Sequence, residues 1–543
     1  MALILPPEVL QHIIGYLSEP KDLLSCCLVC STWCKTGQSH LWNAPVLSRI
    51  ISTKDHNTFE SFFQTTKNSV SLLIQKIETS YCPFENLDKI LSWILRLQSL
   101  RVLKLPVGYL TCSRISNESF AFQNLRLLEH LSIEQTDAGT RLLYQLIAKC
   151  PLLEDISIQL EASHVSNSTL LDVSPKYIPV AKRLQRLKIM EEFRLKPGGR
   201  LKSEFLEAVI LATPCVQRFT IVSYTIPNGF ATILNERCPN LTHFKMQNIH
   251  VYGGPSLNRK LSETCEAIAL HFSTQMIEME LDFRRAHSNN SVVMLPNTWY
   301  EHSWTYLTSL KLSGIQINQQ QMIALSQSLT GDMEVLEINL PTTETHPLQF
   351  SRNELNLHAW LSLFTKCGGT LTSVTVGADY LPNRFVEILS KHCNKLKHLK
   401  LESHTVDDYS VYDIVRYLGK SLNSLHIQSV NLGTKTFHLV ARKCVKLEQL
   451  NLSRTIDIPS HQPYYYSDES RVQPYMETSV TSQFLQSLTR LSLVNWRLGV
   501  EFFQILSNLK NSKLSQVRVS EPVDNCFPLA TLRSKFPEFN IVE

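Results

Sequence analysis

Apolar residues in most of the chain follow one short pattern, L-x-x-L-x-L, in which Ile, Val, Met or Phe can replace Leu. It occurs fifteen times, from LRVLKL at residue 100 to LSQVRV at residue 514, and a weaker copy, VSLLIQ, begins at residue 70. Seven of the fourteen intervals are 25 or 26 residues, and the others are longer. The last two apolar positions alternate with other residues, as in a strand with one buried face. The pattern therefore predicts a strand that recurs along the chain.

Helical patterns lie between these strand strings. Examples are FLEAVILA (205–212), FATILNERC (230–238), FVEILSKHC (385–393) and FHLVARKC (437–444). Each repeat is therefore predicted to hold a strand, a turn and a helix. Because parallel strands lie about 4.8 Å apart and packed helices need roughly 8–10 Å, the stack should curve, with strands on its concave face and helices on its convex face.

The repeat resembles the leucine-rich repeat, in its cysteine-containing subtype. Members of that subtype carry a Cys three residues before the first strand Leu, as Cys150, Cys238, Cys393 and Cys444 do here. These thiols could be reactive groups or core residues. Their fixed position beneath a ladder of Leu residues favours the core.

The first forty-odd residues lack the repeat and predict three short helices. Val9, Leu10, Ile13, Ile14 and Leu17 have helical spacing in the first. Asp22 can cap a second helix and Ser31 a third. So small a unit cannot bury all of its apolar surface, so part of that surface is expected to meet a partner.

This segment resembles the F-box in residues that follow the order of that motif. They are Leu5-Pro6, Glu8, Leu17, Asp22-Leu23, Val29, Cys30, Trp33 and Leu41-Trp42. Many relatives have a basic residue just after the Cys, where this chain has Ser31-Thr32. The resemblance implies docking onto the Skp-type adaptor of a cullin-based (SCF) ubiquitin ligase.

By position in the motif, eight residues would contact the adaptor. They are Leu5, Pro6, Val9, Ile13, Leu28, Val29, Cys30 and Trp33. The alternative makes the same residues an ordinary N-terminal cap on the repeats. A cap would not need this ordered string, so the docking surface is the favoured interpretation.

The stretch SCCLVCSTWC (25–34) raises the question of a metal or redox site. Structural zinc needs four converging ligands, usually in two pairs, and no second pair lies nearby. A thioredoxin-like centre would need a βαβ setting, which this segment lacks. We therefore expect no metal, and Cys30 is interpreted as a small apolar contact.

Composition and motifs exclude several function classes. Hydrophobic residues make up 43% of the chain and charged residues 19%, as in a well-cored protein. A net charge of +5 over 543 residues does not indicate a nucleic-acid partner. No phosphate-binding, metalloprotease, nucleophile-elbow or EF-hand signature occurs, so we expect neither a cofactor nor an active site. A Cys–His pair assembled from distant positions is the remaining enzymatic alternative.

Location is indicated by what the sequence lacks. The opening MALILPPEVL has no basic n-region, and Pro6-Pro7 interrupts its apolar run, so no signal peptide is expected. No apolar stretch is long enough for a membrane span. Fourteen cysteines without a secretory signal indicate a reducing compartment, so the chain is expected in the cytoplasm, the nucleus or both.

Polar positions of the predicted strands offer a candidate substrate surface on the concave face. The basic members are Arg186, Lys188, Arg218, His243 and Lys245, and the next strand presents Glu278, Glu280 and Asp282. One interpretation is a solvated surface whose charges pair with one another. The sharper hypothesis is a site that attracts an acidic or phosphorylated segment of a target protein.

Two long inserts interrupt the repeats. The segment 454–483 is rich in Pro, Tyr and Ser and predicts a rim loop, in which Tyr464, Tyr465 and Tyr466 are either partner anchors or part of a surface insertion. The segment 283–300 (FRRAHSNNSVVMLPNTWY) has the same two interpretations.

These observations together predict an α/β chain: a three-helix F-box followed by a curved leucine-rich-repeat solenoid. The expected domains are the F-box (1–45), a connector with an atypical first repeat (46–99), the solenoid (100–520) and a C-terminal cap of a helical turn and a strand (521–543). The expected function is the substrate receptor of an SCF ubiquitin ligase, with a Skp-type adaptor, a cullin and an unknown protein target as partners. The alternative is a repeat scaffold without a ligase role.

Overall fold

The computed structural model describes most of the repeat region and part of the N-terminal segment. It describes residues 7–16, 25–26, 33, 36–37, 74–78, 97, 99–104, 110–111, 122–134, 137–161, 178–191, 203–223, 226, 229–248, 255–283, 293–341, 355–433, 435–454, 471–472, 478–498, 500–509, 512–520, 529–536 and 538–542. The chain forms two compact units, Met1–Phe244 and Lys245–Glu543.

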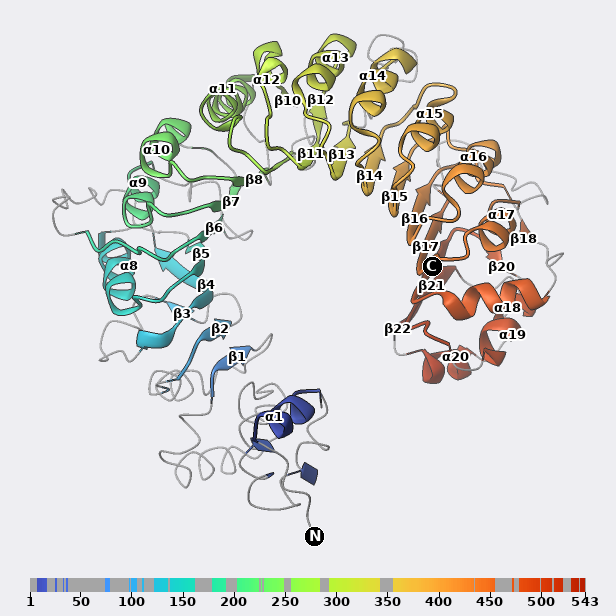
Figure 1. Cartoon of the computed structure of the whole chain (residues 1–543), viewed down its shortest axis with the longest axis horizontal. Coiled ribbons are helices and arrows are strands. Elements are labelled where there is room, and N and C mark those ends of the chain that lie inside the picture. The colour runs from blue at the N-terminus through green and yellow to red at the C-terminus, as the bar shows by residue number, and fades with distance from the viewer. Residues whose placement is uncertain are drawn as a thin grey trace. The chain divides into compact units, whose positions relative to one another are not determined.

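Unit 1 combines helices with a parallel sheet (Figure 1). Its helices are α1 (Pro7–Gly15), the 3₁₀ helix η2 (Phe122–Asn124), α8 (Asp137–Lys149), α9 (Ser203–Leu211) and α10 (Phe230–Arg237). Its strands are β1 (Lys76–Glu78), β2 (Val102–Lys104), β3 (Leu110–Thr111), β4 (Leu127–Glu134), β5 (Asp155–Glu161), β6 (Arg186–Glu191) and β7 (Arg218–Ser223). Strands β1, β2, β4, β5, β6 and β7 pair in that order, all parallel.

Strand β8 (His243–Asn248) contains the boundary, and the remaining elements belong to unit 2. The helices are α11 (Pro255–Phe272), α12 (Asn297–Glu301), α13 (Gln319–Ser328), α14 (Leu357–Cys367), α15 (Phe385–His392), α16 (Asp408–Leu418), α17 (Lys435–Lys443), α18 (Thr478–Ser487), α19 (Val500–Asn508) and α20 (Leu529–Lys535). The strands are β9 (Glu278–Asp282), β10 (Val293–Met294), β11 (Ser309–Ser313), β12 (Ile315–Gln316), β13 (Val335–Asn339), β14 (Ser373–Gly377), β15 (His398–Glu402), β16 (Ser424–Gln428), β17 (Gln449–Ser453), β18 (Arg471–Val472), β19 (Arg490–Val494), β20 (Arg497–Leu498), β21 (Gln516–Ser520) and β22 (Glu538–Val542). No helix among the described residues is long and apolar enough to cross a membrane.

The main sheet of unit 2 is a parallel ladder without register shifts. Its strands pair in the order β9, β11, β13, β14, β15, β16, β17, β19, β21 and β22. Apolar residues at the second and fourth strand positions are buried, as Leu399 and Leu401 of β15 and Leu425 and Ile427 of β16 show. Figure 1 shows helices α13 to α17 on one side of strands β13 to β17. The buried rows and the helices therefore form the core, and the other face of the sheet carries the polar residues.

All fifteen strand strings of the repeat contain a strand of the structure. The weaker copy at residue 70 was placed wrongly, because strand β1 begins at Lys76. Ile74 and Ile77 fill the buried positions of this repeat, and Ile77 lies beside Leu103 of β2. The apolar pattern that starts at residue 70 therefore lies four residues before the pattern that Ile74 and Ile77 form.

The repeat cysteines sit at the turn between helix and strand. At Cys393, the backbone N–H closes the end of α15 on the carbonyl of Leu389, and the Cys393 carbonyl accepts from the N–H of Leu396. The same pair of hydrogen bonds occurs at Cys150, Cys238 and Cys444. The side chains of all four cysteines are buried, so a small apolar residue suits this turn.

The structure describes only parts of the two inserts, 283–300 and 454–483. The loop interpretation of 283–300 is wrong for its second half, where β10 pairs with β12 and α12 buries Trp299 and Tyr300. Most of 454–483, including Tyr464, Tyr465 and Tyr466, lies outside the described residues. At the C-terminal end, the expected strand is β22, which pairs with β21.

Candidate interaction surfaces

Helix α1 has two apolar faces. Leu10 and Ile14 are buried, whereas Val9 is 44% exposed and Ile13 is 42% exposed. Each pair is spaced by four residues, so its members lie one above the other on the helix. Tyr16 extends the exposed set. One face of the helix therefore packs in the interior of the chain, and the other exposes apolar side chains to solvent.

A small cluster supports the buried face of α1. It contains Leu10, Ile14 and Cys26, and the partly buried Trp33 packs against it. Trp33 thus has a core contact besides any partner contact implied by its place in the motif. The other positions assigned to the adaptor, Leu5, Pro6, Leu28, Val29 and Cys30, lie outside the described residues. Sequence reasoning did not single out Cys26, whose side chain is buried in this cluster.

Buried thiols are held in their protonated form. Burial raises the pKa of Cys150, Cys238 and Cys444 to about 12. Neutral thiols are poor nucleophiles and poor metal ligands, which argues against the reactive-thiol interpretation. Within the described ranges, no three His, Cys, Asp or Glu residues converge as a metal site would require.

Alkylation should separate these thiols from the exposed ones. At about pH 8, iodoacetamide is expected to modify the partly exposed Cys215 while Cys150, Cys238 and Cys444 stay unmodified until denaturant is added, because a thiol with a pKa near 12 has almost no thiolate. Mass spectrometry of the digested chain would measure this. Modification of Cys238 in the native chain as fast as in the denatured chain would contradict its placement in the core.

The predicted basic residues of unit 1 differ in their pairing. The Arg186 guanidinium lies 3.6 Å from a carboxylate oxygen of Asp155 on the neighbouring strand. Arg218 lies beside Arg186 in the strand register and is exposed, and Lys188 is two residues further along β6. His243 accepts or donates a hydrogen bond with the Thr242 hydroxyl at 2.8 Å. The surface is basic, but part of its charge is compensated within the chain.

In unit 2 the predicted residues form a compensated cluster. Glu280 is buried, with 8% of the residue exposed. One of its carboxylate oxygens lies 2.5 Å from the Lys245 ammonium, and the other lies 3.6 Å from the Lys311 ammonium. Glu278 and Asp282 flank it on β9 and are partly exposed. The interpretation in which strand charges pair with one another therefore fits Lys245 and Glu280. The change of sign predicted from sequence lies within unit 2, between Lys245 of β8 and Glu278 of β9.

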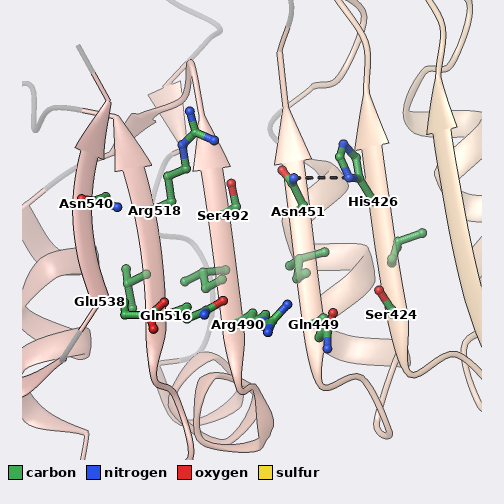
Figure 2. Close-up of a pocket in the computed structure, with 14 residues that line it drawn as sticks. Ser424, His426, Gln449, Asn451, Arg490, Ser492, Gln516, Arg518, Glu538 and Asn540 are labelled. Atoms are coloured by element: carbon green, nitrogen blue, oxygen red, sulfur yellow. Dashed lines mark hydrogen bonds between the residues drawn. The ribbon is translucent and has the colours of Figure 1, made fainter. Parts of the chain in front are cut away.

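A pocket of about 350 Å³ lies on the polar face of β16, β17, β19, β21 and β22, far along the chain from these residues (Figure 2). Its first row, at the start of the strands, runs across Ser424, Gln449, Arg490, Gln516 and Glu538. Figure 2 shows Arg490 reaching from β19 toward Gln449. Sequence reasoning missed this site because it looked for runs of charge, and the row is mostly uncharged.

The second row lies two residues further along the same strands. It runs across His426, Asn451, Ser492, Arg518 and Asn540. The Asn451 amide nitrogen and His426 Nδ1 are 3.3 Å apart. Burial, with a further contribution from Lys400, lowers the pKa of His426 to about 4, so the ring is neutral at pH 7.

The depressed pKa of His426 makes stability depend on pH. Above about pH 6.5 the ring is neutral in both states and contributes nothing. Between about 6.5 and 4 the unfolded chain binds a proton that the folded chain excludes, so stability falls as the pH falls, by roughly 2 kcal/mol at about pH 5. His426→Gln should lose less stability on acidification, which urea unfolding of unit 2 at about pH 7.5 and about pH 5 would measure. An equal loss in both proteins would contradict the burial of this ring.

Comparison with known families identifies the N-terminal segment. Residues 2–48 match the family described as F-box-like. The chain therefore begins with an F-box-like domain, which contains α1 and the cluster of Leu10, Ile14 and Cys26. A large sheet of parallel strands, consistent with a repeat solenoid, follows it.

Proposed function

We propose that this chain is the substrate-recognition subunit of an SCF-type ubiquitin ligase. The observation that carries the proposal is the F-box-like domain at residues 2–48, whose helix α1 exposes Val9 and Ile13. F-box domains bind Skp-type adaptors, and an exposed pair of apolar side chains on a helix suits a partner's groove. The adaptor in turn would connect the chain to a cullin.

The repeat region is proposed to be a curved solenoid of leucine-rich repeats of the cysteine-containing subtype. The strand order, the buried Leu rows and the cysteine turns support this assignment. The difference between strand spacing and helix spacing supports the curvature. A three-helix F-box, with Leu5, Pro6, Val9, Ile13, Leu28, Val29, Cys30 and Trp33 facing the adaptor, completes the proposed architecture.

The proposed mechanism is proximity rather than catalysis by this chain. Holding a target on the strand face raises the concentration of its lysines near the ubiquitin-transfer subunits, which leads to ubiquitination and degradation by the proteasome. The basic residues Arg186, Lys188 and Arg218 are one proposed contact for a target. A location in the cytoplasm or nucleus is part of the proposal, because the ligase works there.

Adaptor capture tests the function. Full-length chain mixed with a purified Skp-type adaptor should elute as one complex in size-exclusion chromatography, and a chain carrying Pro6→Ala and Trp33→Ala should bind less. Because Trp33 also packs on the α1 cluster, circular dichroism must show that the variant keeps its helices. A chain that binds no adaptor while folded would be better described as a repeat scaffold.

A further inference from the structure

The pocket on β16 to β22 has polar atoms without partners on three consecutive strands. His426 Nε2, Asn451 Oδ1 and Ser492 Oγ are each buried, and none has a hydrogen-bond partner among the described residues. A Glu402 carboxylate oxygen lies 3.9 Å from His426 Nε2, beyond hydrogen-bond distance. Buried polar atoms usually have partners, so three neighbouring exceptions mark a place where polar groups of another molecule can bind. All three belong to the second row of the pocket.

The same pocket holds two arginines whose charge is not compensated. Arg490 and Arg518 are exposed, and no carboxylate of the described residues forms an ion pair with either. The acidic residue of the lining, Glu538, lies beside Gln516 in the register rather than beside an arginine. With His426 neutral, the formal charge of the lining is therefore positive.

Three other strand cations of unit 2 have partners. Lys245 and Lys311 lie at Glu280, and Lys400 lies 2.9 Å from Glu402. The positive charge of the pocket is thus a local feature and not a general property of this sheet. Amide and hydroxyl donors surround it, so an anion would meet hydrogen-bond donors as well as charge.

The positions of the two arginines give the spacing of the anionic groups. Arg490 belongs to the first row and Arg518 to the second row of the adjacent strand. Rows two residues apart along a strand are separated by about 6.6 Å, and adjacent strands by about 4.8 Å. An extended peptide places side chains of the same face about 6.8 Å apart. The Cα atoms of the two arginines are therefore about 8 Å apart on the sheet. Their long side chains can reach two acidic side chains at alternate positions of such a peptide. Figure 2 shows both arginines on the open side of the strands.

From this arrangement we infer that the pocket binds an extended segment of a target protein in which two carboxylate side chains stand at alternate positions. Arg490 and Arg518 hold the carboxylates, and the polar atoms of Asn451 and Ser492, in the same row as Arg518, bind peptide groups of the segment. The inference rests on the proposed receptor function and names the class of target. Charge complementarity selects this occupant over a neutral or basic segment.

Fluorescence anisotropy on the adaptor-bound full chain tests the inference. The probe is a labelled peptide of Gly and Ser with Glu at two alternate positions, and comparison peptides carry Lys or phosphoserine there. We expect the Glu peptide to bind with a dissociation constant of about 100 μM and the Lys peptide not to bind. The double variant Arg490→Glu, Arg518→Glu should weaken binding at least tenfold, because each charge-assisted contact becomes repulsive.

A matched control is the double variant Lys420→Glu, Lys446→Glu, which makes the same change of charge at exposed turns of unit 2. It should bind the Glu peptide within about twofold of the wild type, since screening weakens charges outside the pocket. Equal losses in both variants would overturn the inference, as would no binding of the Glu peptide or binding of the phosphoserine peptide alone. Adaptor binding, measured in the same samples, separates the two claims: its loss counts against the receptor function, while its retention without peptide binding counts against the pocket.

Discussion

The double variant Val9→Asp, Ile13→Asp is expected to lose adaptor binding by at least about 100-fold, which corresponds to about 3 kcal/mol, while the chain stays folded. Both side chains are more than 40% exposed on α1, so the charges remain in water in the free chain. In the proposed complex the same carboxylates would be buried in an apolar interface without partners. Isothermal titration of purified adaptor into the full chain would measure the loss.

Two further substitutions on α1 make this result interpretable. Gln11→Asp adds a carboxylate to an exposed position outside the apolar pair and should leave adaptor binding within about twofold. Leu10→Asp buries a charge in the cluster with Ile14 and Cys26 and should unfold the domain. If Val9→Asp, Ile13→Asp binds the adaptor as the wild type does, the exposed face of α1 is not the docking surface.

Leu401→Ala is expected to destabilise unit 2 by about 2–5 kcal/mol. The Leu401 side chain is fully buried in β15, between Val376 of β14 and Ile427 of β16 in the strand register. A repeat contacts only its neighbours, so a cavity in the middle of the ladder weakens the strands on both sides. Urea unfolding would give the free-energy change, and hydrogen exchange of β14 to β16 would locate it.

The neighbouring residue provides the control for this cavity. Lys400→Ala removes the 2.9 Å ion pair with Glu402, whose two side chains are about one-third exposed. A pair this exposed contributes roughly 0–1 kcal/mol, so the variant should unfold close to the wild type. Similar stabilities for Leu401→Ala and Lys400→Ala would mean that the two faces of β15 have been assigned the wrong way round.

The repeat could be predicted from sequence because the alternation of apolar residues within each strand indicates which of its residues are buried. In LKHLKL, the alternation around Leu399 and Leu401 fixes which residues face the helices, and fifteen such strings reinforce one another. The position of the first repeat was predicted wrongly because the apolar residues of VSLLIQ fit the repeat pattern in more than one register. Pairing with β2, which places Ile77 beside Leu103, decides between them, and this information is not local.

The 283–300 insert was interpreted as a loop that either anchors a partner or forms a surface insertion, and no helix was predicted in its second half. In the structure, Trp299 packs with its ring centroid 5.0 Å from that of Tyr300 and 5.2 Å from that of Trp304, and this burial sustains the short helix α12. Tertiary packing of aromatic side chains thus stabilises a helix that the local sequence pattern does not reveal.

Sequence reasoning found one of the two candidate sites and missed the other. Val9 and Ile13 followed from a motif, and helical spacing alone separates them from Leu10 and Ile14. The pocket was missed because Arg490 and Arg518 stand 28 residues apart in the sequence and most of the polar residues around them on the sheet are neutral. A comparison of the polar strand positions that counted hydrogen-bonding side chains as well as runs of like charge would have placed them together.

Assembly with a cullin tests the central claim most directly. Full-length chain, purified Skp-type adaptor and the adaptor-binding part of a cullin should be mixed in pairs and all together, and the masses of the complexes measured by light scattering after size-exclusion chromatography. We expect a complex with one copy of each protein, and no association of the chain with the cullin when the adaptor is left out. A chain that stays apart from adaptor and cullin, or a Val9→Asp, Ile13→Asp variant that joins them unchanged, would contradict the assignment as an SCF receptor.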